Sequence, residues 1–342
     1  SNIKGEVIPM SFIINNGDQD PAILINGFGE GYGDTGDHFA VTDEGEVIYT
    51  TVQEGYKEGI KWLHSLVEQD LVDPEAFTQE WSSYVAKGKN HRYGLCFTWD
   101  IANIDNYEDY VMMPALAGPD GLVNITRQNG SETSGFDRGR CVLTTSCRDT
   151  ALAAAWIDQM YAPLQSPQNN WGTYGEKDAD NIFEMSTNAE GGPMLKHLDL
   201  GDASPVEVRQ AQSVNGPLAV LNDYYDVYVT QPDDAKWRLD NMHEVYLDDM
   251  HSKYVYPNVF MSIDDTNRVS QLDTDIKKYA EQKKADWILN GGIDEEWDEY
   301  LQKMEDYGLS EYLQIKQKYF DSYQESLAEL EAAGSADDAS GN

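Results

Sequence analysis

Cysteine is scarce in this sequence: a chain of 342 residues contains three, Cys96, Cys141 and Cys147. A small, odd number of cysteines cannot form the disulfide framework that would hold such a chain together. Low cysteine use is compatible with a cytosolic protein and equally with an exported bacterial protein of this size. The cysteine content therefore excludes a disulfide-stabilised scaffold and leaves the compartment open.

Long apolar runs are also missing. No stretch approaches the roughly 18 apolar residues that a membrane-spanning helix needs. No basic segment followed by an apolar one opens the chain, so the sequence shows no signal peptide. Because the chain starts almost directly in a strand predicted at residues 7–14, we expect an N-terminal truncation. The missing signal then says nothing about location.

Basic side chains are few: 24 lysines and arginines stand against 61 aspartates and glutamates, for a formal net charge of −37. Like charges repel when molecules meet, so neither a nucleic-acid backbone nor an anionic membrane surface is an expected partner. The charge does not imply global disorder, because 40% of the residues are hydrophobic and 11% are aromatic. The length exceeds that of one ordinary domain and fits two lobes.

The sequence motifs of catalysis and metal binding are absent. The six histidines form neither a His-Glu-x-x-His pattern nor a Cys/His cluster. The G-x-S-x-G elbow is missing, and the glycines at residues 27–33 lack the G-x-G-x-x-G spacing of a dinucleotide loop. Asp34 and Asp37, near Glu30, lack the order of a calcium-binding EF-hand loop and are interpreted as a solvated turn. We therefore expect no catalytic residue, no bound metal and no cofactor.

Strands interleaved with helices predict an α/β fold with a helical C-terminal third. A hairpin is expected at residues 39–49, because Asp-Glu-Gly separates two apolar segments there. An amphipathic helix over residues 56–67 ends before a proline, and a strand follows at residues 93–97. A further strand is predicted at residues 140–144, and the chain beyond residue 171 is expected to be mostly helical.

Tryptophans fall into two groups by their spacing. Trp156, Trp287 and Trp297 lie on apolar stripes with helical periodicity and are predicted to be core residues. Trp99 follows the strand at residues 93–97, and its loop position gives it no periodic reason to be buried. We therefore predict that Trp99 faces a ligand.

Aromatic rings beside small polar groups recur where predicted strands give way to loops or helices. In an open α/β sheet, ligands bind beyond the carboxyl ends of the strands. There Trp99 offers a flat apolar face to a sugar ring, and Asp100 can accept hydrogen bonds from neighbouring hydroxyls. A core position is an equally good interpretation of Trp171 and Tyr224. The further candidates for ligand binding are Trp171, Tyr174, Arg138, Tyr224 and Tyr225.

A series of motifs then runs in a recognisable order along nearly the whole chain. The segments are residues 5–12, 54–63, 71–75, 86–89, 93–100, 110–121, 170–176 and 297–312. Their order resembles that of the family 1 extracellular solute-binding proteins of ABC importers. The chain is most similar to the long lipoproteins that take up oligosaccharides, including aldouronates. Trp99 matches the tryptophan that often stacks on the sugar in such proteins.

The resemblance implies a periplasmic-binding-protein-like clamshell of type II, with the second lobe nearly complete and the first lobe partial. The implied division is residues 1–130 and 171–330 for the second lobe, 131–170 for a remnant of the first, and 331–342 for a disordered tail. It also implies non-enzymatic capture of an extracellular oligosaccharide and its delivery to the membrane permease of an ABC transporter. The protein would be a bacterial cell-surface lipoprotein whose signal peptide and lipid anchor are not in this chain.

Two other functions are compatible with the residues. A carbohydrate-active enzyme such as a glycoside hydrolase would need two carboxylates about 5 to 10 Å apart across one pocket. A binding protein for a peptide or another polar solute would differ only in the ligand. Arg127, Arg138 and Arg140 suit an acidic sugar such as an aldouronate. A neutral oligosaccharide is an equally good interpretation, because arginines also pair with this chain's many carboxylates.

Overall fold

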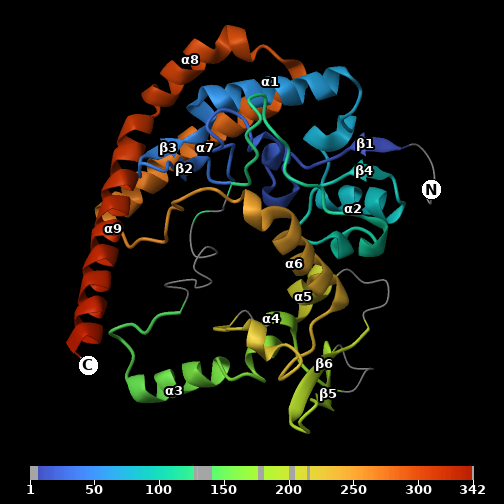
Figure 1. The fold of residues 1–342 in the computed structure, drawn as a ribbon, viewed down its shortest axis with the longest axis vertical. Helices are drawn as coiled ribbons and strands as arrows, with labels where there is room; N and C mark the ends of the chain where they lie inside the picture. The colour runs from blue at the N-terminus through green and yellow to red at the C-terminus, as the bar shows by residue number, and fades with distance from the viewer. Residues whose placement is uncertain are drawn as a thin grey trace. The chain divides into compact units, whose positions relative to one another are not determined.

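The chain forms two compact units in the computed structural model, which describes residues 7–126, 129, 141–175, 181–199, 205–213 and 216–340 (Figure 1). Unit 1 comprises Ser1–Phe97, Met113–Asp137 and Glu244–Asn342. Unit 2 comprises Thr98–Met112 and Arg138–His243. The boundaries between these units differ from the lobe boundaries that the resemblance implied at residues 130, 170 and 330. The assignment of the lobes stays a prediction.

Short two-stranded sheets make up the β-structure described in unit 1. Strand β1 (Ile8–Met10) pairs in parallel with β4 (Tyr93–Leu95), so the strands predicted at residues 7–14 and 93–97 are both present but shorter. Strands β2 (Phe39–Val41) and β3 (Val47–Tyr49) form the predicted antiparallel hairpin. A parallel pair needs a long crossover, and the hairpin and helix α1 (Glu54–Glu68) lie within it.

Helices provide most of the rest of unit 1. They are α1, α2 (Trp81–Lys89), α7 (Ile263–Asn290), α8 (Ile293–Asp306) and α9 (Leu309–Ser340). Short 3-10 helices connect them: η1 (Gly17–Gln19), η2 (Pro21–Ile25), η3 (Thr50–Val52), η4 (Pro74–Phe77) and η9 (Leu247–Asp249). Helix α9 continues to Ser340 and so runs through the segment in which we expected a disordered tail.

Helix boundaries in the C-terminal part follow local chemistry. Ser262 caps the N-terminus of α7, and its hydroxyl accepts a hydrogen bond from the amide of Asp265. Gly291, which has a φ of 74°, follows the last residue of the helix. Gly308 lies between α8 and α9 with a φ of 90°, where a side chain would be strained.

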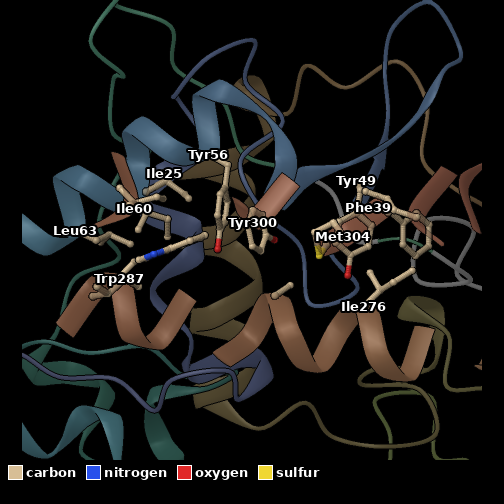
Figure 2. Packing of buried hydrophobic residues seen from close by; sticks show 14 of the residues in the cluster. Ile25, Phe39, Tyr49, Tyr56, Ile60, Leu63, Ile276, Trp287, Tyr300 and Met304 are labelled. Atoms are coloured by element: carbon tan, nitrogen blue, oxygen red, sulfur yellow. The ribbon is translucent and has the colours of Figure 1, made fainter. Parts of the chain in front are cut away.

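The core of unit 1 lies where α7 and α8 pack against α1, and where α9 packs against strand β3 of the hairpin (Figure 2). Ile60 and Leu63 from α1 approach Trp287 from α7, and the rings of Trp287 and Tyr300 meet edge to face with centroids 4.8 Å apart. Trp287 and Trp297 are both buried, so the prediction that they are core residues is confirmed. Each fully buried large side chain contributes on the order of 2 kcal/mol to stability.

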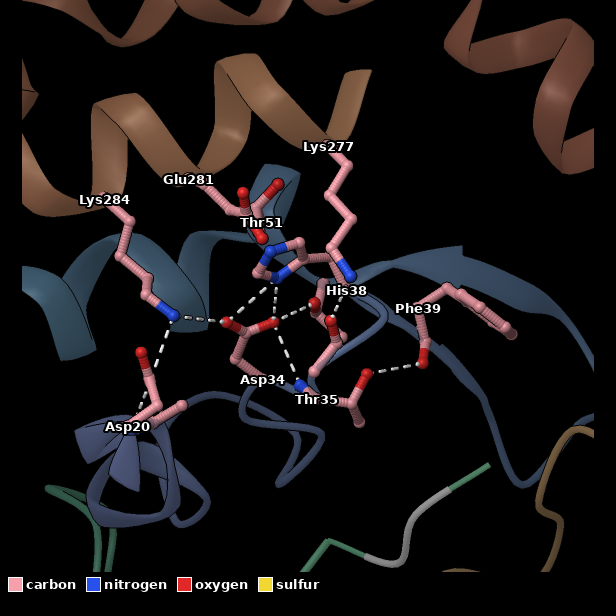
Figure 3. Close-up of polar contacts among 12 residues, drawn as sticks. Asp20, Asp34, Thr35, His38, Phe39, Thr51, Lys277, Glu281 and Lys284 are labelled. Carbon is pink, nitrogen blue, oxygen red and sulfur yellow. Dashed lines mark hydrogen bonds and ion pairs between the residues drawn. The ribbon is translucent and has the colours of Figure 1, made fainter. Parts of the chain in front are cut away.

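A charged cluster is buried beside this core (Figure 3). The ammonium of Lys284 on α7 lies 3.0 Å from Asp20 and 3.6 Å from Asp34. Asp34 also accepts a hydrogen bond of 2.6 Å from Thr50 and lies 2.9 Å from His38 Nδ1. Asp34 is therefore buried, and the interpretation of this turn as solvated is wrong for that residue, because Lys284 arrives from a distant part of the chain.

Unit 2 contains helices α3 (Thr150–Met160), α4 (Ser166–Trp171) and α5 (Pro205–Gln212), and most of α6 (Asp233–Tyr246). It also contains the short 3-10 helices η5 (Ile101–Asn103), η6 (Tyr107–Asp109) and η8 (Asn222–Tyr224). Strands β5 (Phe183–Thr187) and β6 (Pro193–His197) pair antiparallel, with Met185 opposite Leu195. Around them a small core gathers, formed by Ile182, Phe183, Leu195 and Val229.

The structure corrects three predictions for unit 2. The chain beyond Trp171 is not mostly helical at first, because β5 and β6 form a hairpin whose turn contains Gly191 with a φ of 84°. Of the strand predicted at residues 140–144, the described residues 141–144 are not in a strand. Trp156 was predicted to be a core residue and is 57% exposed on α3.

Candidate ligand-binding site

Trp99 and Asp100 follow β4 at the start of the first segment of unit 2. Asp100 caps η5: its Oδ1 accepts a hydrogen bond of 3.0 Å from the amide of Ala102. The hydroxyl of Thr98 donates to the carbonyl oxygen of Asp100 at 3.1 Å. These two contacts fix the backbone on both sides of Trp99, because a capped turn holds its first residue in one conformation.

Arg238 on α6 joins these two residues. Its Nε donates a hydrogen bond of 2.9 Å to Oδ2 of Asp100, and both side chains are largely buried. Its guanidinium carbon lies 5.2 Å from the centroid of the Trp99 ring, which is a cation–π distance. Arg238 thus covers one face of the indole and holds it in place.

The Trp99 side chain is only partly covered by protein. Trp99 remains 53% exposed although Arg238 lies over its ring. About half of its surface is therefore accessible to solvent. A flat, exposed and immobilised indole suits stacking on an apolar face of a sugar ring, because little conformational freedom is lost on binding.

Charged and phenolic groups surround Arg238. Asp234 lies one helical turn before it on α6, and burial together with the negative charge of Asp100 raises the pKa of the Asp234 carboxyl. Burial also raises the pKa of the Tyr225 hydroxyl, while the positive charge of Arg238 acts in the opposite direction. Asp234 and Tyr225 thus add hydrogen-bonding groups to the surroundings of the Asp100–Arg238 pair.

A pair of aromatic rings also joins η6 to α6, the helix that carries Arg238. Tyr107 on η6 and Trp237 on α6 have ring centroids 5.7 Å apart. Trp237 precedes Arg238 directly in the sequence, so α6 contributes both an aromatic ring and a cation.

Trp171 and Tyr224 are partly buried against the small core of unit 2. Trp171, the last residue of α4, meets the rings of His197 and Phe183 edge to face at 5.2 and 6.2 Å. Tyr224 meets Tyr228 in the same way at 5.4 Å. Both side chains therefore contribute to packing, in agreement with the alternative interpretation given for them from the sequence.

The other sequence candidates lie in different surroundings. Tyr225 packs on the small core, and the positive charge of Arg238 acts on its hydroxyl. Tyr174 is 48% exposed, and its backbone forms an isolated β-bridge with Phe183. Helix α5 contacts both α4 and η5, so it links the end of α4 with the turn that Asp100 caps. Arg138 lies outside the described residues, as do Arg127 and Arg140.

Sequence reasoning missed Arg238 and Asp234. Both are separated from Asp100 by more than 130 positions, and neither belongs to a local motif. The available signal was weak: one arginine beside a tryptophan in an acidic helix.

Among the described residues no group of three histidine, cysteine, aspartate or glutamate side chains is arranged to hold a metal ion. In the same part of the chain, no helix is both long and apolar enough to cross a membrane.

No protein-family model matches the chain. Over 324 residues it is 46% identical to the fructooligosaccharide ABC transporter substrate-binding protein FusA of Streptococcus pneumoniae serotype 4, strain TIGR4. The match takes in 94% of this chain and 59% of FusA, so the chain spans less than two thirds of that relative.

Solved structures give the same picture. FusA of S. pneumoniae in complex with kestose superposes with a TM-score of 0.83 at 46% identity, over 94% of this chain and 64% of that one. An EF-hand mutant of FusA in complex with fructo-nystose gives a TM-score of 0.82 with the same coverage. A solute-binding protein from Bifidobacterium longum infantis, described as binding HMO, shares the fold at a TM-score of 0.70 and 20% identity, over 94% and 66% of the two chains.

The similarity extends through both units, because it takes in 94% of the chain. It confirms the α/β, periplasmic-binding-protein-like fold that was inferred from the order of the motifs. Over 94% of its length the chain is therefore similar to FusA, a substrate-binding protein of an ABC transporter.

Proposed function

We propose that this protein captures an oligosaccharide outside the cell and delivers it to the membrane permease of an ABC transporter, without catalysing a reaction. The observation that carries the proposal is the exposed indole of Trp99, held by Arg238 and Asp100 in a chain 46% identical to FusA. Such a surface binds by stacking and hydrogen bonding, and needs no nucleophile or general acid.

The proposed ligand class is a fructooligosaccharide. FusA is named for fructooligosaccharides and its structures hold kestose or fructo-nystose. Kestose carries hydroxyl groups and no carboxylate, so it would be recognised through hydrogen bonds and ring stacking rather than through an ion pair. The neighbours of Trp99 fit such a ligand, because Arg238 already has its counter-charge in Asp100. This favours the neutral oligosaccharide over the aldouronate considered from the sequence.

The same pairing argues against the glycoside hydrolase. Both carboxylate oxygens of Asp100 have protein partners, the amide of Ala102 and the guanidinium of Arg238. Neither oxygen is therefore left free to act as one of the two carboxylates that glycoside hydrolysis needs. The permease and a lipid anchor at the cell surface complete the proposal, which is supported by the similarity of the chain to an ABC transporter substrate-binding protein.

Calorimetric titration of the chain with kestose, nystose and an aldouronate tests the proposal. We expect binding of the first two, and a loss of at least about 30-fold in affinity for Trp99→Ala, because a central aromatic contact is worth about 2 kcal/mol or more. Trp156→Ala is the matched control, since Trp156 is 57% exposed against 53% for Trp99 and lies in the same unit. Its affinity should be that of the wild type.

Three results would contradict the proposal. Unchanged affinity in Trp99→Ala would remove Trp99 from the site. Binding of the aldouronate alone would assign the wrong ligand class. Release of fructose or shorter oligosaccharides on incubation with the purified protein would identify an enzyme instead.

A further inference from the structure

Asp234 lies next to the pair formed by Asp100 and Arg238. It precedes Arg238 by four residues on α6, and residues four apart on a helix are neighbours on its surface. Arg238 in turn donates to Asp100 at 2.9 Å and lies 5.2 Å from the centroid of the Trp99 ring. The helical spacing and these two contacts place Asp234 beside the residue that contacts both Asp100 and Trp99.

The carboxyl of Asp234 differs from that of Asp100 in its partners. Both oxygens of Asp100 are engaged, one by the amide of Ala102 and the other by Arg238. No side chain in the described part of the chain donates a hydrogen bond to Asp234 or forms an ion pair with it. The amides of Asp234 itself and of Ala235, in the first turn of α6, favour its ionised form. A carboxylate has about four acceptor sites, so Asp234 keeps acceptor capacity for a ligand.

The charged and titratable groups of this neighbourhood come from α6, from the turn before η5 and from η6: Arg238, Asp233, Asp100, Tyr107 and Glu108. Burial and the negative charge of Asp100 raise the pKa of Asp234, while two backbone amides and Arg238 act in the opposite direction. Burial also raises the pKa of the Tyr107 hydroxyl, with contributions from its acidic neighbours, Asp234 among them. Asp234 therefore takes up a proton at a higher pH than an exposed aspartate does.

A sugar hydroxyl suits the ionised form of this carboxyl. A hydrogen bond from a hydroxyl to a carboxylate is shorter and roughly twice as strong as one between neutral groups. Kestose, which a FusA structure holds, carries hydroxyl groups and no carboxylate, so the charge of Asp234 does not repel it. Once Asp234 is protonated, it no longer offers this charged acceptor.

We propose that the Asp234 carboxylate accepts hydrogen bonds from hydroxyl groups of the oligosaccharide, and that its protonation in acid weakens binding. This inference rests on the proposed function, because it adds a ligand contact and a control by pH to the same surface. A sugar that binds the ionised form lowers the pKa of Asp234 in the complex. Binding therefore releases protons at a pH between the values for the complex and for the free protein, and the affinity is constant above both.

Calorimetric titration with kestose between about pH 4 and 7 tests the proposal. At pH 7 we expect Asp234→Asn to weaken binding about tenfold, because asparagine keeps the shape of the side chain and loses its charge. The affinity of the wild type should fall several-fold as the pH decreases, and that of Asp234→Asn should change less. Titrations in two buffers with different ionisation enthalpies should show proton release by the wild type that the variant lacks. The variant retains His197 and Asp100, so the difference reports on Asp234 alone.

Asp240→Asn is the matched control. Asp240 lies on the same helix and pairs with Lys236, and the side chains of both residues are exposed. The control should bind kestose like the wild type at every pH. Circular dichroism and thermal unfolding at each pH monitor the fold of both variants. If Asp234 only stabilised α6, Asp234→Asn would lower the thermal stability and leave the proton release on binding as in the wild type.

The outcomes separate this inference from the proposed function. Kestose binding by the wild type, with the same affinity and proton release in Asp234→Asn, would overturn the inference and leave the proposed function intact. An affinity that rises as the pH falls would also overturn it, since the protonated carboxyl is then the binding form. If the wild type binds neither kestose nor nystose at pH 7, the proposed function fails and the role of Asp234 fails with it.

Discussion

The guanidinium carbon of Arg238 lies 5.2 Å from the centroid of the Trp99 ring, while the Nε of the same side chain donates to Asp100. One arginine thus fixes the orientation of the indole and neutralises the carboxylate beside it. An exposed tryptophan without such a neighbour would sample several rotamers. The proposed sugar-binding surface therefore depends on a residue that does not have to touch the sugar ring.

Removing the guanidinium should weaken sugar binding. For Arg238→Gln we expect the dissociation constant for kestose to rise about 5- to 30-fold, that is by about 1–2 kcal/mol, because the indole loses its support. Arg238→Lys keeps the charge without the planar fork, and should fall between the wild type and the glutamine variant. Arg268→Gln, which removes an exposed pair with Glu311, is the calorimetric control. Equal affinities in all four proteins would separate Arg238 from the site.

Asp100→Asn tests the charge of the cap without removing the cap, because asparagine also accepts from the amide of Ala102. The negative charge of Asp100 contributes to the raised pKa of Asp234. In the variant we expect the pKa of Asp234 to fall towards its ordinary range, followed by NMR titration of the side-chain carboxyl. Sugar affinity should fall as well, since Arg238 loses its partner. An unchanged pKa of Asp234 would show that burial alone determines it.

Lys284→Met should destabilise unit 1 by about 3–5 kcal/mol, because it leaves Asp20 and Asp34 buried without their cation. Denaturant unfolding followed by fluorescence of the core tryptophans measures the loss. Lys318→Met, which removes an exposed pair with Asp265, should leave the unfolding midpoint of unit 1 unchanged. Similar losses in the two variants would mean that burial of the Lys284 cluster has no special cost.

The same cluster predicts how unit 1 responds to acid. Burial alone would raise the pKa of Asp34, but its interactions with His38, Lys284 and Thr50 outweigh burial and hold the pKa at about 2. The folded value lies below the unfolded value of about 4, so the stabilisation is complete above about pH 4 and is lost as the pH falls through 2. In Asp34→Asn the free energy of unfolding should depend less on pH between about pH 4 and 2. Denaturant unfolding at each pH measures this dependence.

His197 gives unit 2 a response at higher pH. Burial lowers its pKa to about 4, and its Nε2 has no hydrogen-bond partner in the described part of the chain. Because the folded pKa lies below the unfolded value of about 6.5, stability is complete above about pH 6.5 and declines as the pH falls to 4. NMR should show the imidazole titrating near pH 4. A midpoint near 6.5 would contradict the buried environment.

Local signals in the sequence predicted much of unit 1. The hairpin at residues 39–49 follows from its turn residues, and Trp287 and Trp297 follow from helical periodicity on helices that pack within the chain. Trp156 has the same periodicity and is exposed. Periodicity states which side a helix must bury but not whether the chain supplies the covering surface.

The site shows a related limit. Trp99 and Asp100 were predicted together because they are adjacent in the sequence and follow a strand. Their contact with Arg238 depends on how α6 packs within unit 2, and no local pattern encodes that distance. The hairpin of β5 and β6 was missed because two strands of five residues each lie in a segment rich in loop residues.

Asp100 uses one oxygen to begin a turn of helix and the other to hold a cation. The carboxylate cannot rotate without breaking the turn or releasing the arginine, so the geometry around the indole exists before any sugar arrives. A sugar therefore does not have to reorganise Asp100, Arg238 and the indole when it binds. Differences in affinity among related sugars should then appear in how quickly they leave rather than in how quickly they bind.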